Sequence, residues 1–85
     1  MQVIIPMSGA GERFRRVGYT LPKPLIVVED KPIIAHVIDL FPGETDFVFI
    51  CNQAHLDNPD YRMAETLRHY CPTGRIVAVE GKKLG

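Results

Sequence analysis

The chain has 85 residues, with ten Lys and Arg, ten Asp and Glu, and a formal net charge of zero. This length is that of one small domain or of part of a larger one, and a neutral chain is not expected to be a general binder of nucleic acid. No apolar run approaches the roughly 18 residues of a membrane span, and residues 1–6 lack the features of a signal peptide. We therefore expect a cytoplasmic protein that binds neither nucleic acid nor a membrane.

Three short apolar runs predict strands that are buried on both faces of a parallel sheet. They are rich in Val, Ile and Phe, and polar residues do not alternate cleanly with the apolar ones. The runs cover Val3–Met7, Phe47–Cys51 and Arg75–Val79.

Two helical patterns lie between these strands. The first has Pro32 in its first turn and stops at Pro42-Gly43. The second begins at Asn58-Pro59, where Asn58 is a suitable cap, and ends near Pro72. The apolar residues at helical spacing are Ile33, Ile34, Val37, Ile38 and Phe41 in the first pattern and Tyr61, Met63, Ala64, Leu67 and Tyr70 in the second.

The order of these elements is strand, long loop, helix, strand, helix, strand, which predicts an α/β fold with parallel strands and right-handed crossovers. The long loop runs from Ser8 to about Val28 and includes a short extended stretch at Leu25–Val28. A loop of this length in a small domain is usually functional. Because the chain stops soon after the third strand, we expect residues 1–85 to be the N-terminal part of one larger domain. The alternative is a natural small protein with a polar tail.

The two cysteines do not suggest a disulfide scaffold. Cys51, His55, His69 and Cys71 could be read as a zinc site, but their spacing is C-x3-H followed by H-x-C, which matches no common zinc pattern. Cys51 also closes an apolar run, where a free Cys acts as a small core residue. We favour the core interpretation and assign no metal ligand.

A glycine pair follows the first strand directly, and such glycines let a backbone approach an anion closely. The dinucleotide fingerprint requires a third glycine where Phe14 stands, and the Gly-Lys-Ser/Thr step of the Walker loop is absent. Residues 8–23 nevertheless hold four cations and one acid, a local charge of +3. The cations are Arg13, Arg15, Arg16 and Lys23. Arg and Lys in such a loop suit phosphate oxygens, and the alternative is a solvated basic loop that uses glycine for turning.

Two stretches together resemble the signature of the sugar-phosphate nucleotidyltransferases. They are Gly9-Ala10-Gly11-Glu12-Arg13-Phe14 and Pro22-Lys23-Pro24-Leu25-Ile26; Pro32-Ile33-Ile34 and a strand that ends near Glu80 are similar too. The resemblance covers the whole chain but only the N-terminal part of a family member. It implies a Rossmann-like three-layer nucleotide-binding sandwich, of which residues 1–85 would form the N-terminal β-α-β-α-β portion.

The resemblance also implies an activity and the residues that perform it. The enzyme would transfer a nucleotidyl group from a nucleoside triphosphate to a sugar 1-phosphate, or to a related phosphorylated alcohol, and release pyrophosphate. Arg13 and Lys23 would be catalytic, with Arg13 on the leaving phosphates and Lys23 near the α-phosphate. The residues expected to contact the nucleotide are Ser8, Gly9, Ala10, Gly11, Glu80 and Gly81.

The resemblance implies Mg²⁺ as cofactor, with carboxylate ligands downstream of residue 85, so we expect the 85 residues alone to be inactive. Two rival functions remain, a glycosyltransferase of similar fold that uses a nucleotide sugar and a non-catalytic nucleotide-sensing domain. In the family the first strand has a neighbour from later sequence, so its edge would be unpaired here. An unpaired strand edge can pair with a second copy of the chain and so form a homo-oligomer.

Overall fold

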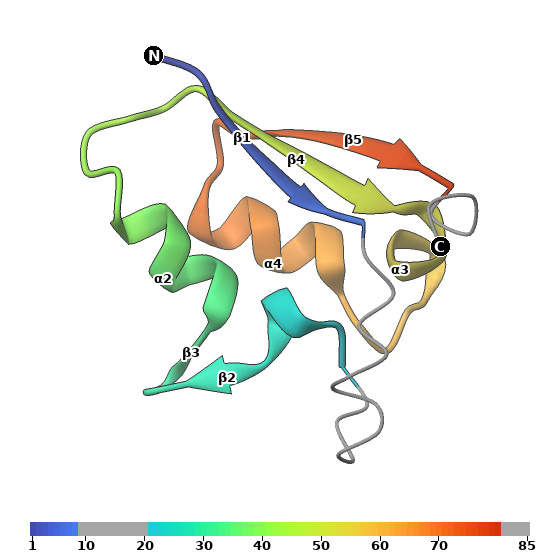
Figure 1. Ribbon diagram of the computed structural model, residues 1–85. Coiled ribbons are helices and arrows are strands. Elements are labelled where there is room, and N and C mark those ends of the chain that lie inside the picture. The colour runs from blue at the N-terminus through green and yellow to red at the C-terminus, as the bar shows by residue number, and fades with distance from the viewer. Residues whose placement is uncertain (9–20, 81–85) are drawn as a thin grey trace.

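The computed structural model describes residues 1–8 and 21–80. Its centre is a parallel sheet of β1 (Val3–Met7), β4 (Phe47–Asn52) and β5 (Arg75–Val79), in the order β1-β4-β5 (Figure 1). The three predicted strands and their parallel arrangement are confirmed, and β4 is one residue longer than the apolar run.

Both connections between these strands carry helices. The first contains the 3₁₀ helix η1 (Lys23–Leu25), the short hairpin of β2 (Val27–Val28) and β3 (Lys31–Pro32), and α2 (Ile33–Asp39); the second contains α3 (Gln53–Asp57) and α4 (Met63–Tyr70). The two connections step across the sheet in the same direction, and right-handed crossovers of this kind place their helices on the same face. Figure 1 shows α2 and α4 below the sheet. The predicted alternation of strands and helices is confirmed.

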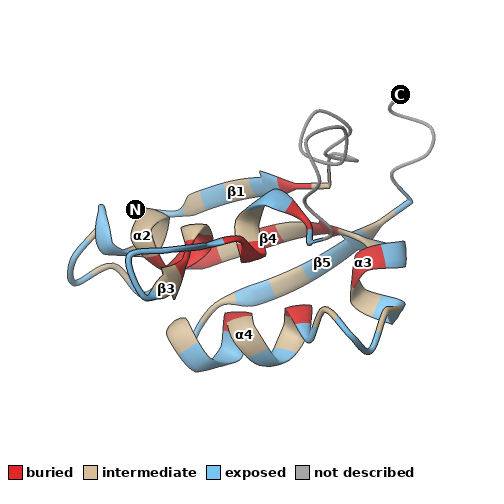
Figure 2. Cartoon of the chain, turned by 90° about the horizontal axis from the view of Figure 1, so that it is seen from below, coloured by how far each residue is buried: buried red, intermediate tan, exposed pale blue. Residues whose placement is uncertain are grey.

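The core lies between β4 and these helices. Phe47, Phe49 and Cys51 alternate along β4, are almost completely buried, and pack with Ile34 of α2 and Leu67 of α4. The rings of Phe47 and Phe49 stack with their centroids 6.0 Å apart. Figure 2 shows that α4 turns its buried residues toward the sheet. Cys51 therefore acts as a core residue, as the apolar run indicated.

The opposite face of the sheet is more open. Ile4 is 55% exposed and Val77 is 43% exposed, and both lie on the face away from α2 and α4. The described residues thus form two layers of the three-layer sandwich that the resemblance implies. None of the described helices is long and apolar enough to cross a bilayer.

β1 is an outer strand of the sheet over the residues described. The Val3 N–H donates to the Asp46 carbonyl at 2.9 Å, so alternate N–H groups of β1 face β4. At residue 6 the N–H would point to the open edge, and this residue is Pro6, which has none. Proline is tolerated at such an edge position because no ladder hydrogen bond is lost. Self-association through this edge stays a prediction.

The first helix lies where the sequence places it but is shorter. Pro32 precedes its first turn, and α2 ends at Asp39, before Phe41. The hairpin of β2 and β3 is bound to this helix at two points. A ring nitrogen of His36 lies 2.6 Å from the Val28 carbonyl oxygen, and Lys31 pairs with Asp39. These contacts hold the segment that follows Lys23 against α2.

The predicted start of the second helix is wrong. α4 begins at Met63, preceded by Arg62 in the left-handed conformation with φ of 50°. Asn58 instead accepts a hydrogen bond from the Asp60 N–H at 2.9 Å, which makes a turn. The side chain of Asn serves turns and helix caps equally well, so its presence did not distinguish them. The short helix α3 was not predicted.

Candidate functional site

Three polar residues stand at the carboxyl edge of the sheet. Ser8 directly follows β1, Asn52 ends β4 and Glu80 directly follows β5. The register places Met7 opposite Cys51 and Cys51 opposite Ala78, so the three strands end close to one another. Open α/β sheets bind ligands in the region outside the carboxyl ends of their strands. The structure therefore brings two predicted nucleotide-binding residues, Ser8 and Glu80, to the edge where this fold places a ligand.

The side chain of Asn52 connects two of these strand ends. Its Nδ2 donates to the Ser8 carbonyl at 3.2 Å, and its Oδ1 accepts from the Ala54 N–H at 2.9 Å. The first bond joins the ends of β1 and β4, and the second caps α3. Asn52 was not among the predicted site residues. A residue with good capping properties directly after an apolar run was the signal that could have identified it.

Lys23 lies on a different segment, at the start of η1. The turn is closed by a hydrogen bond from the Leu25 N–H to the Pro22 carbonyl at 2.9 Å and by one from the Ile26 N–H to the Lys23 carbonyl at 3.1 Å. Pro22 and Leu25 are buried, whereas Lys23 is exposed. The neighbouring side chains thus anchor the backbone of Lys23 in the fold, although Lys23 itself is exposed.

The remaining predicted site residues lie outside the described part of the chain. They are Gly9, Ala10, Gly11, Arg13 and Gly81. Their roles stay predictions.

The residues considered for zinc do not form a metal site. Among residues 1–8 and 21–80, no three His, Cys, Asp or Glu side chains gather in a way that could hold a metal ion. Burial raises the pKa of the Cys51 thiol to about 11, which keeps it protonated and a poor ligand at neutral pH. His55 packs edge-on against Tyr61, with ring centroids 5.8 Å apart.

The structure also has an open cleft of about 580 Å³ between α4 and the segment from η1 to β3. Its walls include Leu25, Pro32, Arg62, Glu65 and Tyr70. None of Ser8, Asn52 and Glu80 lines this cleft. We therefore assign the candidate site to the carboxyl edge of the sheet, where the strand topology and the predicted residues agree, and not to the cleft.

Comparisons with known proteins identify relatives of one chemical kind. The chain is 36% identical over 72 residues to the mannose-1-phosphate guanyltransferase of Schizosaccharomyces pombe. It is 30% identical over 56 residues to the UTP–glucose-1-phosphate uridylyltransferase of Haemophilus ducreyi, and 36% identical over 50 residues to the bifunctional protein GlmU of Methanocaldococcus jannaschii. The resemblance to sugar-phosphate nucleotidyltransferases is confirmed.

These similarities cover much of this chain but little of each relative. The three matches cover 82%, 64% and 59% of this chain, respectively, and 18%, 19% and 12% of the relatives. No protein-family model and no solved structure matches the chain. The names of the nucleotidyltransferases above also differ in the nucleotidyl group and in the sugar, so the family resemblance by itself selects neither.

Proposed function

We propose that these residues form the nucleotide-binding part of an enzyme that transfers a nucleotidyl group from a nucleoside triphosphate to a sugar 1-phosphate or related phosphorylated alcohol. The observation that carries this proposal is the 36% identity to a mannose-1-phosphate guanyltransferase over 72 residues. The position of Ser8 and Glu80 at the carboxyl edge of a parallel sheet supports it. The enzyme is proposed to act in the cytoplasm.

The reaction requires mainly that the two substrates are positioned and that the charge on their phosphates is neutralised. A phosphate oxygen of the sugar phosphate attacks the α-phosphorus, the bond from the α-phosphorus to the bridging oxygen of the β-phosphate breaks, and pyrophosphate leaves. Arg13 is proposed to bind the leaving phosphates through its planar fork of donors. Lys23 is proposed to face the charge that shifts at the α-phosphate, since its backbone is held in a closed turn at an exposed position.

Recognition of the base is proposed for Glu80 and Gly81, at the end of β5. Mg²⁺, when bound, neutralises phosphate charge. As the resemblance to the family implies, its carboxylate ligands are proposed to come from sequence after residue 85. Residues 1–85 alone are accordingly proposed to be inactive.

The test is a pyrophosphate-release assay on the intact protein with Mg²⁺. Each of ATP, GTP, CTP and UTP is combined with mannose 1-phosphate or glucose 1-phosphate, the two sugar phosphates that the relatives' names contain. We expect release with at least one pair and only when both substrates are present. Turnover of a nucleotide sugar without pyrophosphate would indicate a glycosyltransferase instead. Triphosphate binding without turnover of either kind would indicate a non-catalytic nucleotide-sensing domain.

A further inference from the structure

Asn52 uses both ends of its side-chain amide at the proposed nucleotide site. Nδ2 donates to the carbonyl of Ser8, a residue 44 positions away in sequence, and Oδ1 accepts from the N–H of Ala54. The two bonds serve different partners. One reaches the first residue after β1, and the other caps the helix that follows Asn52 itself.

The bond to Ser8 continues the sheet at the point where its backbone pairing ends. The pairing of β1 with β4 finishes at Met7 and Cys51, one residue before Ser8 and Asn52. Beyond that pair, the amide of Asn52 takes the place of a backbone donor. A hydrogen bond on the Ser8 carbonyl therefore restrains the backbone of Ser8.

Helix capping alone does not explain the residue type at position 52. A cap requires only an acceptor, and Ser, Thr and Asp provide one as well as Asn does. Ser and Thr hydroxyls can also donate, but a single oxygen would then have to reach both Ser8 and Ala54. Among the usual capping residues, only Asn carries its donor and its acceptor on two separate atoms, and here Nδ2 meets Ser8 while Oδ1 meets Ala54.

We propose that Asn52 is a positioning residue that fixes Ser8, the residue that follows β1, for nucleotide binding. This inference rests on the proposed function, because it takes the segment that begins at Ser8 to bind the triphosphate. Asn52 acts through Ser8 and not through a contact of its own with the reacting atoms. A loop whose first residue is already oriented loses less conformational freedom when the nucleotide binds.

The test separates the two bonds of Asn52 with matched variants of the intact protein. Asn52→Ser keeps a neutral capping acceptor but cannot reach the Ser8 carbonyl, whereas Asn52→Ala loses both bonds. Asp57→Ala is the control, because it removes the 2.8 Å bond from Gln53 Nε2 to Asp57 Oδ1 within α3 and leaves Ser8 untouched. Each variant is titrated with ATP, GTP, CTP and UTP in Mg²⁺ well below its melting temperature. The scalar coupling between Asn52 Nδ2 and the Ser8 carbonyl carbon is recorded by NMR in the parent and in Asp57→Ala, and the Ser8 carbonyl ¹³C shift is recorded in all four proteins.

We expect the coupling in the parent and in Asp57→Ala, and a changed Ser8 carbonyl shift in Asn52→Ser and Asn52→Ala. The Kd for triphosphate should rise about fivefold in both variants at position 52, which is the size expected for the loss of one hydrogen bond. Only Asn52→Ala should also show a clearly lower melting temperature. Parent-like affinity in Asn52→Ser, or a parent without the coupling, would overturn the positioning role while the proposed function stands. A parent that binds none of the four triphosphates would overturn both.

Discussion

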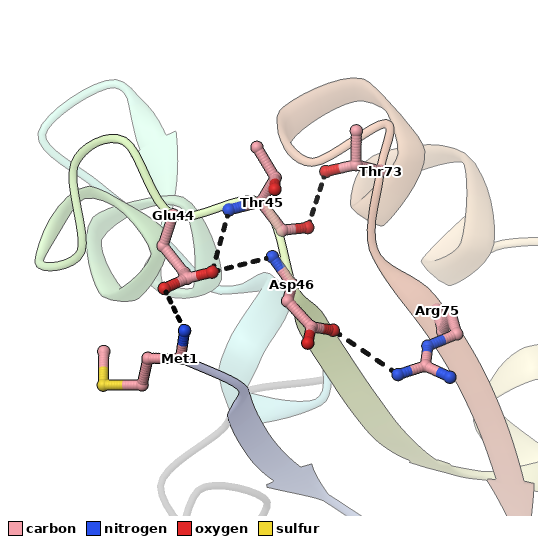
Figure 3. Close-up of polar contacts among 6 residues, drawn as sticks. All are labelled: Met1, Glu44, Thr45, Asp46, Thr73 and Arg75. Carbon is pink, nitrogen blue, oxygen red and sulfur yellow. Dashed lines mark hydrogen bonds and ion pairs between the residues drawn. The ribbon is translucent and has the colours of Figure 1, made fainter.

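At the amino end of the sheet, several side chains connect neighbouring segments. At the carboxyl end, among the residues described, Asn52 is the side chain that connects two strand ends. At the amino end, the carboxylate of Glu44 accepts the N–H groups of Thr45 and Asp46 at 3.2 and 3.1 Å and lies 3.6 Å from the ammonium group of Met1 (Figure 3). Thr73 donates to the Thr45 carbonyl at 2.8 Å, and Arg75 pairs with Asp46 at 3.4 Å.

The amino ends of the strands contribute contacts that stabilise the fold, whereas the carboxyl ends hold the proposed site. The contacts at the amino end join the starts of β1, β4 and β5 through groups that have no part in the proposed reaction. Parallel strands place all of their carboxyl ends at the other edge, where Ser8 and Glu80 lie. Changes at the amino end should therefore alter the free energy of unfolding, and changes in the proposed site residues should alter nucleotide chemistry.

Lys23→Met should have the largest effect, and the effect should be on function. If Lys23 faces charge that develops in the transition state, kcat should fall roughly 100-fold while KM changes much less. Steady-state pyrophosphate release by the intact protein measures both constants. Lys31→Met is the matched control, because Lys31 pairs with Asp39 and lies outside the proposed site. A change in KM alone would make Lys23 a binding residue, and unchanged kinetics would contradict its assignment.

Gly74→Ala should have the largest effect at the amino end, by overpacking the core. A Cβ added to Gly74 would lie 2.5 Å from Cε2 of Phe49, whose ring is fully buried and cannot move freely. The expected loss in the free energy of unfolding is about 1–3 kcal/mol, measured by urea titration.

The Phe49→Leu background tests the cause of that loss. Removing the ring should make the cost of Gly74→Ala smaller, because the two substitutions affect the same contact. An equal cost in both backgrounds would show that the Phe49 ring is not the reason.

Thr73→Val should destabilise the fold modestly and leave triphosphate binding unchanged. The variant removes the donor to the Thr45 carbonyl, and because the site is exposed, the cost should be about 0.5–1 kcal/mol. Thr45→Val is the matched control, since Thr45 contributes its carbonyl and N–H to these bonds and keeps both. Equal unfolding midpoints for the two variants would contradict a stabilising role for the Thr73 hydroxyl.

The smallest effect should be a difference in acid sensitivity at Glu44. Its pKa lies below the ordinary value of 4.5, chiefly because the Asp46 N–H donates to the carboxylate. A lowered pKa stabilises the folded protein above pH 4.5, and this contribution is lost as the pH falls through the pKa of the folded state. Glu44→Gln should therefore lose less thermal stability than the parent between about pH 6 and pH 3. Parallel melting curves over this range would contradict the role of Glu44.

The strands and the chemical family could be predicted because their signals are local. Buried parallel strands are continuous apolar runs, so the bounds of β1 and β5 follow directly from the sequence. The loop motif likewise consists of neighbouring residues with a distinctive spacing of Gly, Arg, Pro and Lys. The relatives confirm the resemblance that this motif carries.

The strand order and the partners of the two Asn side chains could not be predicted, because they depend on contacts between segments that are distant in the sequence. The order β1-β4-β5 leaves β1 as an outer strand of the described sheet, and the strand sequences alone do not state that order. Asn52 and Asn58 are both plausible caps in the sequence, yet Asn52 caps α3 and reaches Ser8, while Asn58 makes a turn. The same side-chain amide can satisfy a helix end, a turn or a distant carbonyl. Which of these partners it meets is set by the packing of strands 44 residues apart, and not by its neighbours along the chain.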